Sequence, residues 1–184
     1  GSYDYWMVRV DSNGNKLWAK SLGGSEIDQG YGITKTEDGN FIIVGDTRST
    51  DGDVSALNGN ADAWVVKFSP DGNIIWEKTY GGAAFDSAKS IVGLQNGNFA
   101  IVGNTRSSVE GFLNRGQNDA WIFIIDANGT LKFNYIIGGT SLDFANAILE
   151  TQDNKLLLVG STESNDMDIL ENKGNQDALL IKIK

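Results

Sequence analysis

The chain has 184 residues, a formal net charge of −9 and a sequence pI near 4.4, and it contains no cysteine and no histidine. These absences exclude disulfides, thiolate zinc sites and catalysis by Ser-His-Asp or Cys-His groups. Because the acidic chain has no cluster of Lys and Arg, we expect neither nucleic acid nor an anionic membrane surface as a partner. No apolar run approaches the roughly 18 residues of a membrane span, which predicts no membrane insertion.

The sequence repeats with a period of about 58 residues, which predicts one repeat domain over residues 1–184. A Gly-x-x-Asp segment that leads into an apolar run begins at Gly1, Gly59, Gly116 and Gly174, in steps of 58, 57 and 58 residues. The predicted units are residues 1–58, 59–115 and 116–173, followed by an extra segment over 174–184.

Strand signals recur in the same order along each repeat. The chain begins with one such signal over residues 5–10. The second repeat shows all four, over residues 63–68, 74–80, 87–94 and 99–103. Tight turns such as Asn96-Gly97 separate them. In the third repeat, residues 144–150 are also compatible with a helix, and the extra segment contains a strand signal over 179–183.

Four short strands per repeat, with glycine turns and recurrent aromatic residues, are typical of a β-propeller blade. A lone four-stranded antiparallel sheet cannot bury both faces, so neighbouring sheets are expected to stack face to face. Recurrent tryptophans such as Trp18 and Trp76 are expected to fill the space between them. The predicted fold is therefore all-β, with three four-stranded antiparallel blades plus one extra strand.

Three blades are fewer than the four to eight that closed propellers typically carry. Two hypotheses follow. The chain is a partial propeller that continues into further blades of the same chain, or it is half of a six-bladed ring that a homodimer partner closes. In the second case, the strand over residues 179–183 completes the last blade as its outer strand, and residues 5–10 complete a blade of the neighbour.

The repeat resembles a known family. Its pattern includes Asp-Ala-Trp-Val-Val-Lys-Phe from Asp62, Asp-Gly-Asn-Ile-Ile-Trp from Asp71 and Gly-Asn-Phe-Ala-Ile-Val-Gly-Asn-Thr from Gly97. This pattern resembles the bacterial seven-bladed β-propeller repeat family, and the Asp51-Gly-Asp-Val-Ser segment resembles repeats of large secreted surface proteins of Bacteroidetes. The resemblance implies a propeller fold and an extracytoplasmic location, secreted or at the cell surface. The third repeat departs from the pattern at Ile124 and at a phenylalanine that replaces tryptophan.

Two sets of aspartates recur once per repeat. One set precedes the first strand and is expected to accept hydrogen bonds from turn amides: Asp4, Asp62, Asp119 and Asp177. The other follows a Gly-Gly pair and is expected to lock each blade as hydrogen-bond acceptors: Asp28, Asp86 and Asp143. In both sets the alternative is that the aspartates serve as ligands in a functional site, and their repetition in every copy favours the structural role.

Alternating acids in two loops suggest a cation. Asp51 and Asp53 match Asp166 and Asp168 of the third repeat, and carboxylates with nearby Asn oxygens suit calcium. The second repeat lacks both acids, and no EF-hand glutamate follows. The loop is therefore either a calcium site or a solvated acidic segment, and we expect no other cofactor.

Arginines at the end of the fourth strand are the main candidates for ligand binding, since Arg can bind carboxylate or sulfate groups. With the threonines that precede them and their counterpart, the candidate ligand-binding residues are Arg48, Arg106, Thr47, Thr105 and Thr162. Glu163 takes the arginine position in the third repeat. The alternative is that each arginine pairs with an acid of the neighbouring blade.

Repetition without a residue unique to one copy argues against catalysis, which needs asymmetry, so we expect no enzyme. The leading hypothesis is a non-catalytic binding or scaffold module of an extracytoplasmic bacterial protein that presents a propeller face to a protein or glycan. One alternative is a fragment of a glycan-cleaving or quinone-dependent propeller enzyme whose catalytic residues lie in missing blades. The other is a structural spacer of a surface adhesin.

Overall fold

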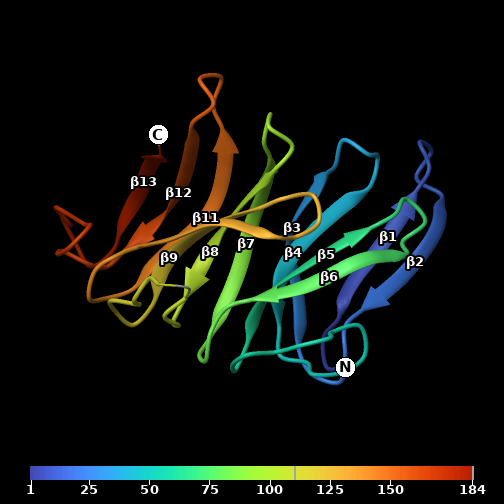
Figure 1. The fold of residues 1–184 in the computed structure, drawn as a ribbon, viewed down its shortest axis with the longest axis horizontal. Helices are drawn as coiled ribbons and strands as arrows, with labels where there is room; N and C mark the ends of the chain where they lie inside the picture. Colours follow the sequence, from blue (N-terminus) through green and yellow to red (C-terminus); the bar gives the residue numbers. More distant parts are fainter. Residues whose placement is uncertain (110, 184) are drawn as a thin grey trace.

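The computed structural model describes residues 1–109 and 111–183, and within them the chain is all-β (Figure 1). These residues contain no helix long and apolar enough to cross a membrane. The strands in the described residues are β1 (Tyr5–Val10), β2 (Lys16–Leu22), β3 (Asp28–Lys35), β4 (Phe41–Thr47), β5 (Asp62–Phe68), β6 (Ile74–Tyr80), β7 (Asp86–Gly93), β8 (Phe99–Thr105), β9 (Asp119–Ile125), β10 (Leu131–Ile137), β11 (Asp143–Glu150), β12 (Leu156–Thr162) and β13 (Asp177–Ile183). The strand prediction is confirmed, including β11, where a helix was the alternative.

In the described part of the chain these strands form four antiparallel sheets. Their orders are β1-β2, β3-β4-β5-β6, β7-β8-β9-β10 and β11-β12-β13. The extra strand β13 joins β12 in the last sheet. The sheets are blade-like units, and in the described residues they do not close into a ring (Figure 1).

The sheets are two strands out of phase with the sequence repeats. The expectation that each repeat forms one blade is therefore wrong. Residues 59–115 give β5 and β6 to one sheet and β7 and β8 to the next. The apolar content of the strands explains this phase. All seven residues of β5 and of β8 are buried, whereas the edge strand β6 is largely half-exposed. In the two four-stranded sheets, the most buried strands therefore lie at the centre, where both faces are covered.

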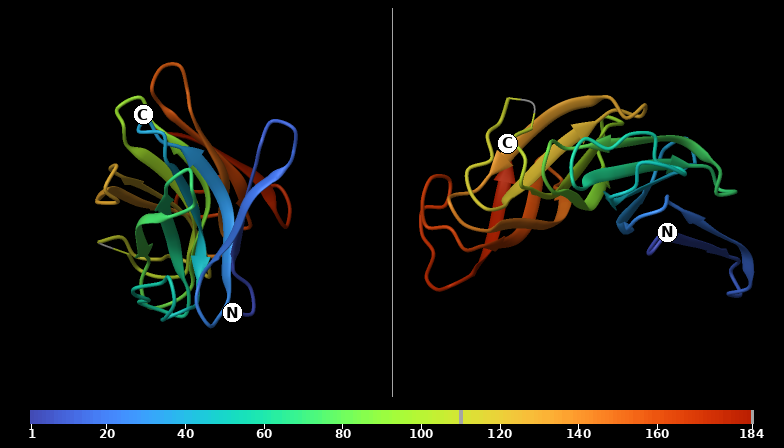
Figure 2. Two further views of the ribbon diagram at one scale, coloured as in Figure 1. Left: turned by 90° about the vertical axis from the view of Figure 1, so that its right-hand side faces the viewer. Right: turned by 90° about the horizontal axis from the view of Figure 1, so that it is seen from below.

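The sheets stack face to face in a curved row whose N-terminal and C-terminal ends bend toward the same side (Figure 2). Between the second and third sheets, Val44 and Val65 pack in one cluster with Ile91, Ile101 and Phe123. An equivalent cluster between the third and fourth sheets contains Val102, Ile122 and Ile148. Each interior sheet is thus sandwiched between two neighbours, as expected for stacked blades.

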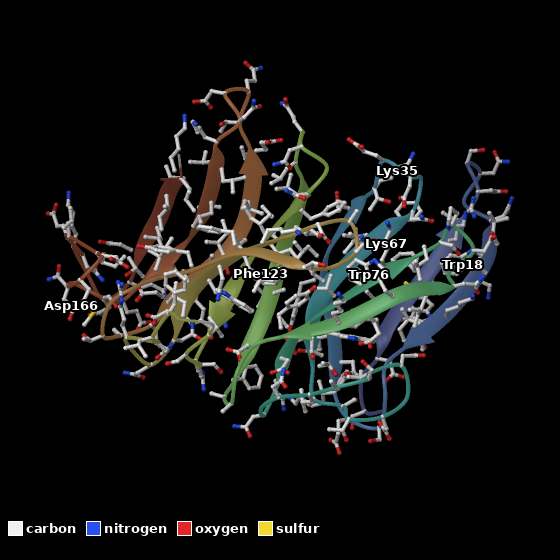
Figure 3. All side chains as sticks on the ribbon, viewed as in Figure 1. Trp18, Lys35, Lys67, Trp76, Phe123 and Asp166 are labelled. Atoms are coloured by element: carbon white, nitrogen blue, oxygen red, sulfur yellow. The ribbon has the colours of Figure 1, made fainter. Side chains whose placement is uncertain are left out.

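The recurrent tryptophans link adjacent sheets by hydrogen bonds at their outer edges (Figure 3). The Trp18 indole on β2 donates to the carbonyl of Pro70 at 3.2 Å, and the Trp76 indole on β6 donates to the carbonyl of Ala127 at 3.2 Å. Each carbonyl lies in the hairpin turn of the following sheet. Phe133, the third-repeat counterpart, has no donor and is 40% exposed.

A β-bulge recurs in the first strand of each larger sheet, where the register shifts in β3, β7 and β11. In β7 the shift falls between Ala88 and Ser90, opposite Gly103 of β8. A Cβ on Gly103 would overlap the carbonyl oxygen of Ser87, so only glycine fits where the two backbones approach.

Candidate ligand-binding face

Three equivalent buried carboxylates lock the sheets from inside. Asp86 at the start of β7 accepts hydrogen bonds from the hydroxyls of Thr105 and Ser107 and from the amide of Gly82. Asp28 and Asp143 accept the same set in their own sheets. All three carboxylates are at most 1% exposed. The prediction that these acids are blade-locking acceptors is confirmed.

This arrangement assigns a structural role to the threonines that the sequence suggested as ligand-binding residues. Thr47, Thr105 and Thr162 are at most 3% exposed, and each hydroxyl donates to its buried aspartate. A side chain without surface cannot contact a ligand. The threonine part of the prediction is therefore corrected, while the neighbouring arginines point to solvent.

The acids that precede the first strands of the second repeat, the third repeat and the extra segment also bind turn amides, as predicted. Asp62 accepts the amide of Asn58, and Asp119 accepts the amide of Arg115, each at 2.7 Å. Their second carboxylate oxygens are buried and meet no described donor. Burial raises the pKa of Asp62, and the nearby charge of Asp86 raises it further. At each of these two sheet junctions, one buried carboxylate from each sheet therefore lies beside the same Gly-Gly turn, as Asp62 of β5 and Asp86 of β7 do.

The loop acids predicted as calcium ligands cap the Gly-Gly turns. Asp51 accepts the amide of Ser25 at 2.7 Å, and Asp53 accepts that of Gly23 at 3.1 Å. In the third repeat, Asp166 accepts from Thr140, and Asp168 accepts from Gly138 and from the Arg115 guanidinium. Within residues 1–109 and 111–183 no group of three or more acidic side chains is arranged to hold a metal ion. These hydrogen bonds account for the position of the acids, and calcium stays a prediction.

The two predicted arginines meet on one phenylalanine. The guanidinium carbons of Arg48 and Arg106 lie 5.0 and 5.9 Å from the centroid of the Phe85 ring. Both arginine side chains are exposed, and Phe85 is half-buried. The backbone fixes this placement, because the amide of Arg48 donates to Ile27 and that of Arg106 donates to Phe85. We call Arg48, Phe85 and Arg106 the arginine–phenylalanine cluster.

Neither guanidinium of this cluster forms an ion pair with any residue that the structure describes. The predicted alternative, pairing with an acid of the neighbouring sheet, is therefore not what the described residues show. Stacking on an aromatic ring holds a guanidinium by its face and leaves its N–H groups free at the edge. Two such groups can bind carboxylate or sulfate oxygens.

Phe85 was not singled out from the sequence. Its counterparts in the other repeats are Ile27 and Leu142, so the position carries an aromatic ring in the second repeat alone. Departure from the repeat at a position beside a buried aspartate was the available signal. Glu163, in the third repeat, lies within 3.4 Å of the Gln176 side-chain amide instead of an aromatic ring.

The fold defines an all-β protein of stacked, blade-like antiparallel sheets with an exposed pair of arginines on a phenylalanine. No protein-family profile matches the chain. The chain is 24% identical over 178 residues to the regulatory protein FlaEY of Caulobacter vibrioides. The match covers 89% of this chain and only 18% of FlaEY. The chain also resembles the crystal structure of a protein of unknown function from Bacteroides caccae, with 9% identity and a TM-score of 0.45. That match covers 85% of this chain and 46% of the other chain.

Proposed function

We propose that the chain is a non-catalytic binding or scaffold module that holds carboxylate or sulfate groups of a protein or glycan partner at the arginine–phenylalanine cluster. The observation that carries this proposal is the pair of exposed guanidiniums on Phe85 without an ion pair among the described residues. In a chain of net charge −9, acids are plentiful, so two arginines held away from them favour an external anion.

The rest of the face supports binding without chemistry. The buried aspartates, threonines and serines beneath the cluster recur in the same geometry in three sheets. Catalysis needs a residue that differs from its repeats and touches substrate, whereas this framework is the same in each copy. We further propose, on the resemblance of the repeats, that the module belongs to an extracytoplasmic bacterial protein.

Binding to immobilised heparin and to polyglutamate, used as sulfate and carboxylate probes, tests the proposal. We expect salt-sensitive retention of the wild-type chain on at least one probe and about a tenfold or greater weakening in the Arg48→Ala/Arg106→Ala double variant. Arg9→Ala is the matched control, because Arg9 already contacts Asp71 and the carbonyl of Pro70. Equal retention of the double variant and the wild-type chain would refute the proposed site.

A further inference from the structure

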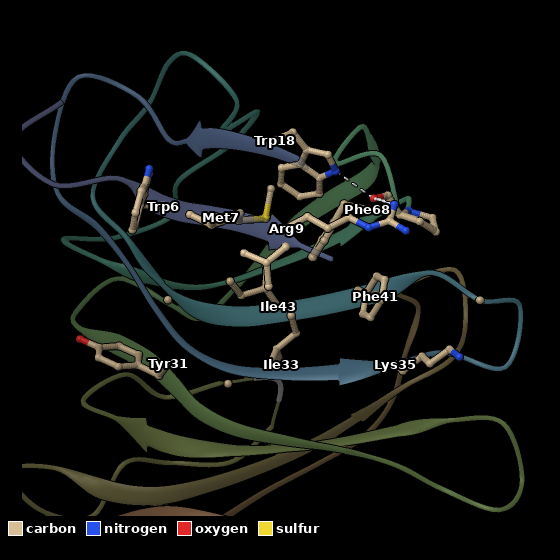
Figure 4. A pocket seen from close by; sticks show the side chains of 16 residues that line it. Trp6, Met7, Arg9, Trp18, Tyr31, Ile33, Lys35, Phe41, Ile43 and Phe68 are labelled. Carbon is tan, nitrogen blue, oxygen red and sulfur yellow. Dashed lines mark hydrogen bonds between the residues drawn. The ribbon is translucent and has the colours of Figure 1, made fainter. Parts of the chain in front are cut away.

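An open groove lies between the first two sheets, beside β1 (Figure 4). It measures about 670 Å³ and is lined by apolar side chains that include Met7, Ile33, Phe41 and Ile43. We call it the β1–β3 groove. At the other two sheet junctions the equivalent space is filled by strands of this chain.

The exposure of one repeated isoleucine shows what the groove lacks. Ile33 of β3 is 60% exposed, whereas its counterparts Ile91 of β7 and Ile148 of β11 are 8% and 9% exposed. Ile91 is buried against Ile42 and Val44 of β4, and Ile148 is buried against the matching residues of β8. Among the described strands, the first sheet contains the equivalents of β5 and β6 and none of the equivalents of β3 and β4. The β1–β3 groove is therefore the space of two missing strands.

The edge and outer face of β1 are open in the same way. Among the described strands, β1 pairs with β2 alone, whereas β5 pairs on both sides with β4 and β6. Trp6 is 73% exposed, whereas Trp64, at the same repeat position, is fully buried. An unpaired strand edge beside an exposed apolar face favours the addition of strands from another chain.

The other end of the row carries what the groove lacks. The last sheet contains the equivalents of β3 and β4, which are β11 and β12. They are followed by β13, which occupies the same repeat position as β1. Val159 of β12 is the counterpart of Val44, and it is 44% exposed because no other sheet of the described residues covers it. In the interior junctions, valine at this position packs in one cluster with the counterpart of Ile33. The two open ends are thus complementary.

We propose that two copies of this chain close on each other, with the β1–β2 hairpin of each copy taking the place of β13 beside the partner's β12. Each exchanged sheet then has four strands, and two copies make a closed ring of six sheets. Trp6 takes the buried position that Leu179 holds, and Ile33 is covered by Val159 of the other copy. The proposal concerns the ends of the row and does not depend on the arginine–phenylalanine cluster.

Light scattering over a concentration series gives the first test. We expect a species of twice 19.9 kDa that forms as concentration rises. A chain that stays monomeric at every concentration overturns the proposal and assigns the groove to another occupant, such as further blades of a longer chain. Species larger than two copies overturn the closed ring, because open head-to-tail contacts continue into filaments.

Paired cysteines then decide which strand lies beside β12, and the chain contains no other cysteine. Val159 is the register partner of Leu180 in β13, as Val44 is of Val65 in β5, and Met7 of β1 is the counterpart of Val65. Under oxidation of the dimer, we expect Met7→Cys/Val159→Cys to give a covalent dimer. The matched variant Val159→Cys/Leu180→Cys is expected not to close a disulfide within one chain. The reverse result overturns the exchange of strands.

Discussion

Lys67 and Asp38 form an ion pair of 2.7 Å in which the lysine side chain is 7% exposed and the aspartate is 52% exposed. The pair joins the C-terminal end of β5 to the turn between β3 and β4. The last sheet keeps the same pair as Lys182 and Asp153. The third sheet (β7 to β10) replaces both partners together, with Ile124 at the lysine position and Asn96 at the aspartate position. Ile124 is therefore a coordinated change: where the turn carries no acid, the strand carries no lysine.

We expect Asp38→Asn to lower the free energy of unfolding by about 1–2 kcal/mol, less than for a fully buried pair because Asp38 is half-exposed. Lys67 holds the pKa of Asp38 well below its usual range. The contribution of the pair is therefore complete above the ordinary aspartate pKa and is lost as pH falls through the lowered value. Urea denaturation at several pH values measures both effects. Asp153→Asn, whose lysine is exposed, is the control and should change stability much less.

The buried carboxylates beside the Gly-Gly turns should respond in opposite ways to neutralisation. Asp86→Asn removes an acceptor of two hydroxyls and one amide, and we expect a loss of about 2–4 kcal/mol in unfolding free energy. Asp62→Asn keeps an oxygen for the amide of Asn58 and places its NH₂ where no described donor points. We expect the second change to be neutral or stabilising in urea unfolding, and a loss equal to that of Asp86→Asn would contradict this assignment.

The Asp62 variant should also change the pH dependence of stability. Burial raises the pKa of Asp62 in the folded chain. The wild-type carboxyl therefore favours folding most below its ordinary pKa of about 4, and it loses this contribution as pH rises through the raised value. Asp62→Asn should gain stability relative to the wild type as pH increases from 4 toward 7. A constant difference across this range would show that Asp62 is not perturbed.

The close approach of β7 and β8 at Gly103 predicts a steric cost. Gly103→Ala places a methyl group against the backbone of Ser87, and we expect a loss of about 4 kcal/mol or failure to fold. Gly97→Ala is the control, because Gly97 has a φ of +80° in a turn with open space around it. Its expected loss is about 1–2 kcal/mol, the cost of a left-handed conformation. Thermal unfolding by circular dichroism compares the two.

Metal removal distinguishes the two roles of the loop acids. Asp166 accepts hydrogen bonds from the amide and hydroxyl of Thr140, so Asp166→Ala should lower the melting temperature by a few degrees with or without calcium. The wild-type melting temperature is measured in EDTA and in calcium. If calcium raises the melting temperature of the wild-type chain and Asp166→Ala abolishes this rise, the acids are calcium ligands.

The strands were predictable because apolar alternation and glycine turns are local signals, and the residues 5–10 and 74–80 expected from sequence match β1 and β6. The phase of the sheets was not, because a period fixes the repeat length and does not say which strands pair across the long loops. The roles of Asp28 and Asp86 followed from their recurrence. The role of Phe85 did not, since its contact with arginines from two repeats arises only when the sheets stack.

The phase difference between sheets and repeats has a consequence for how the chain unfolds. Because each interior sheet takes strands from two successive repeats, a repeat cannot detach without breaking two sheets. Repeat proteins whose units are structurally separate can unfold from their ends one unit at a time. Overlapping membership couples neighbouring units here, so we expect residues 28–162 to melt as one cooperative block. The β1–β2 hairpin, which shares no sheet with another strand of the chain's described part, is the first place to open.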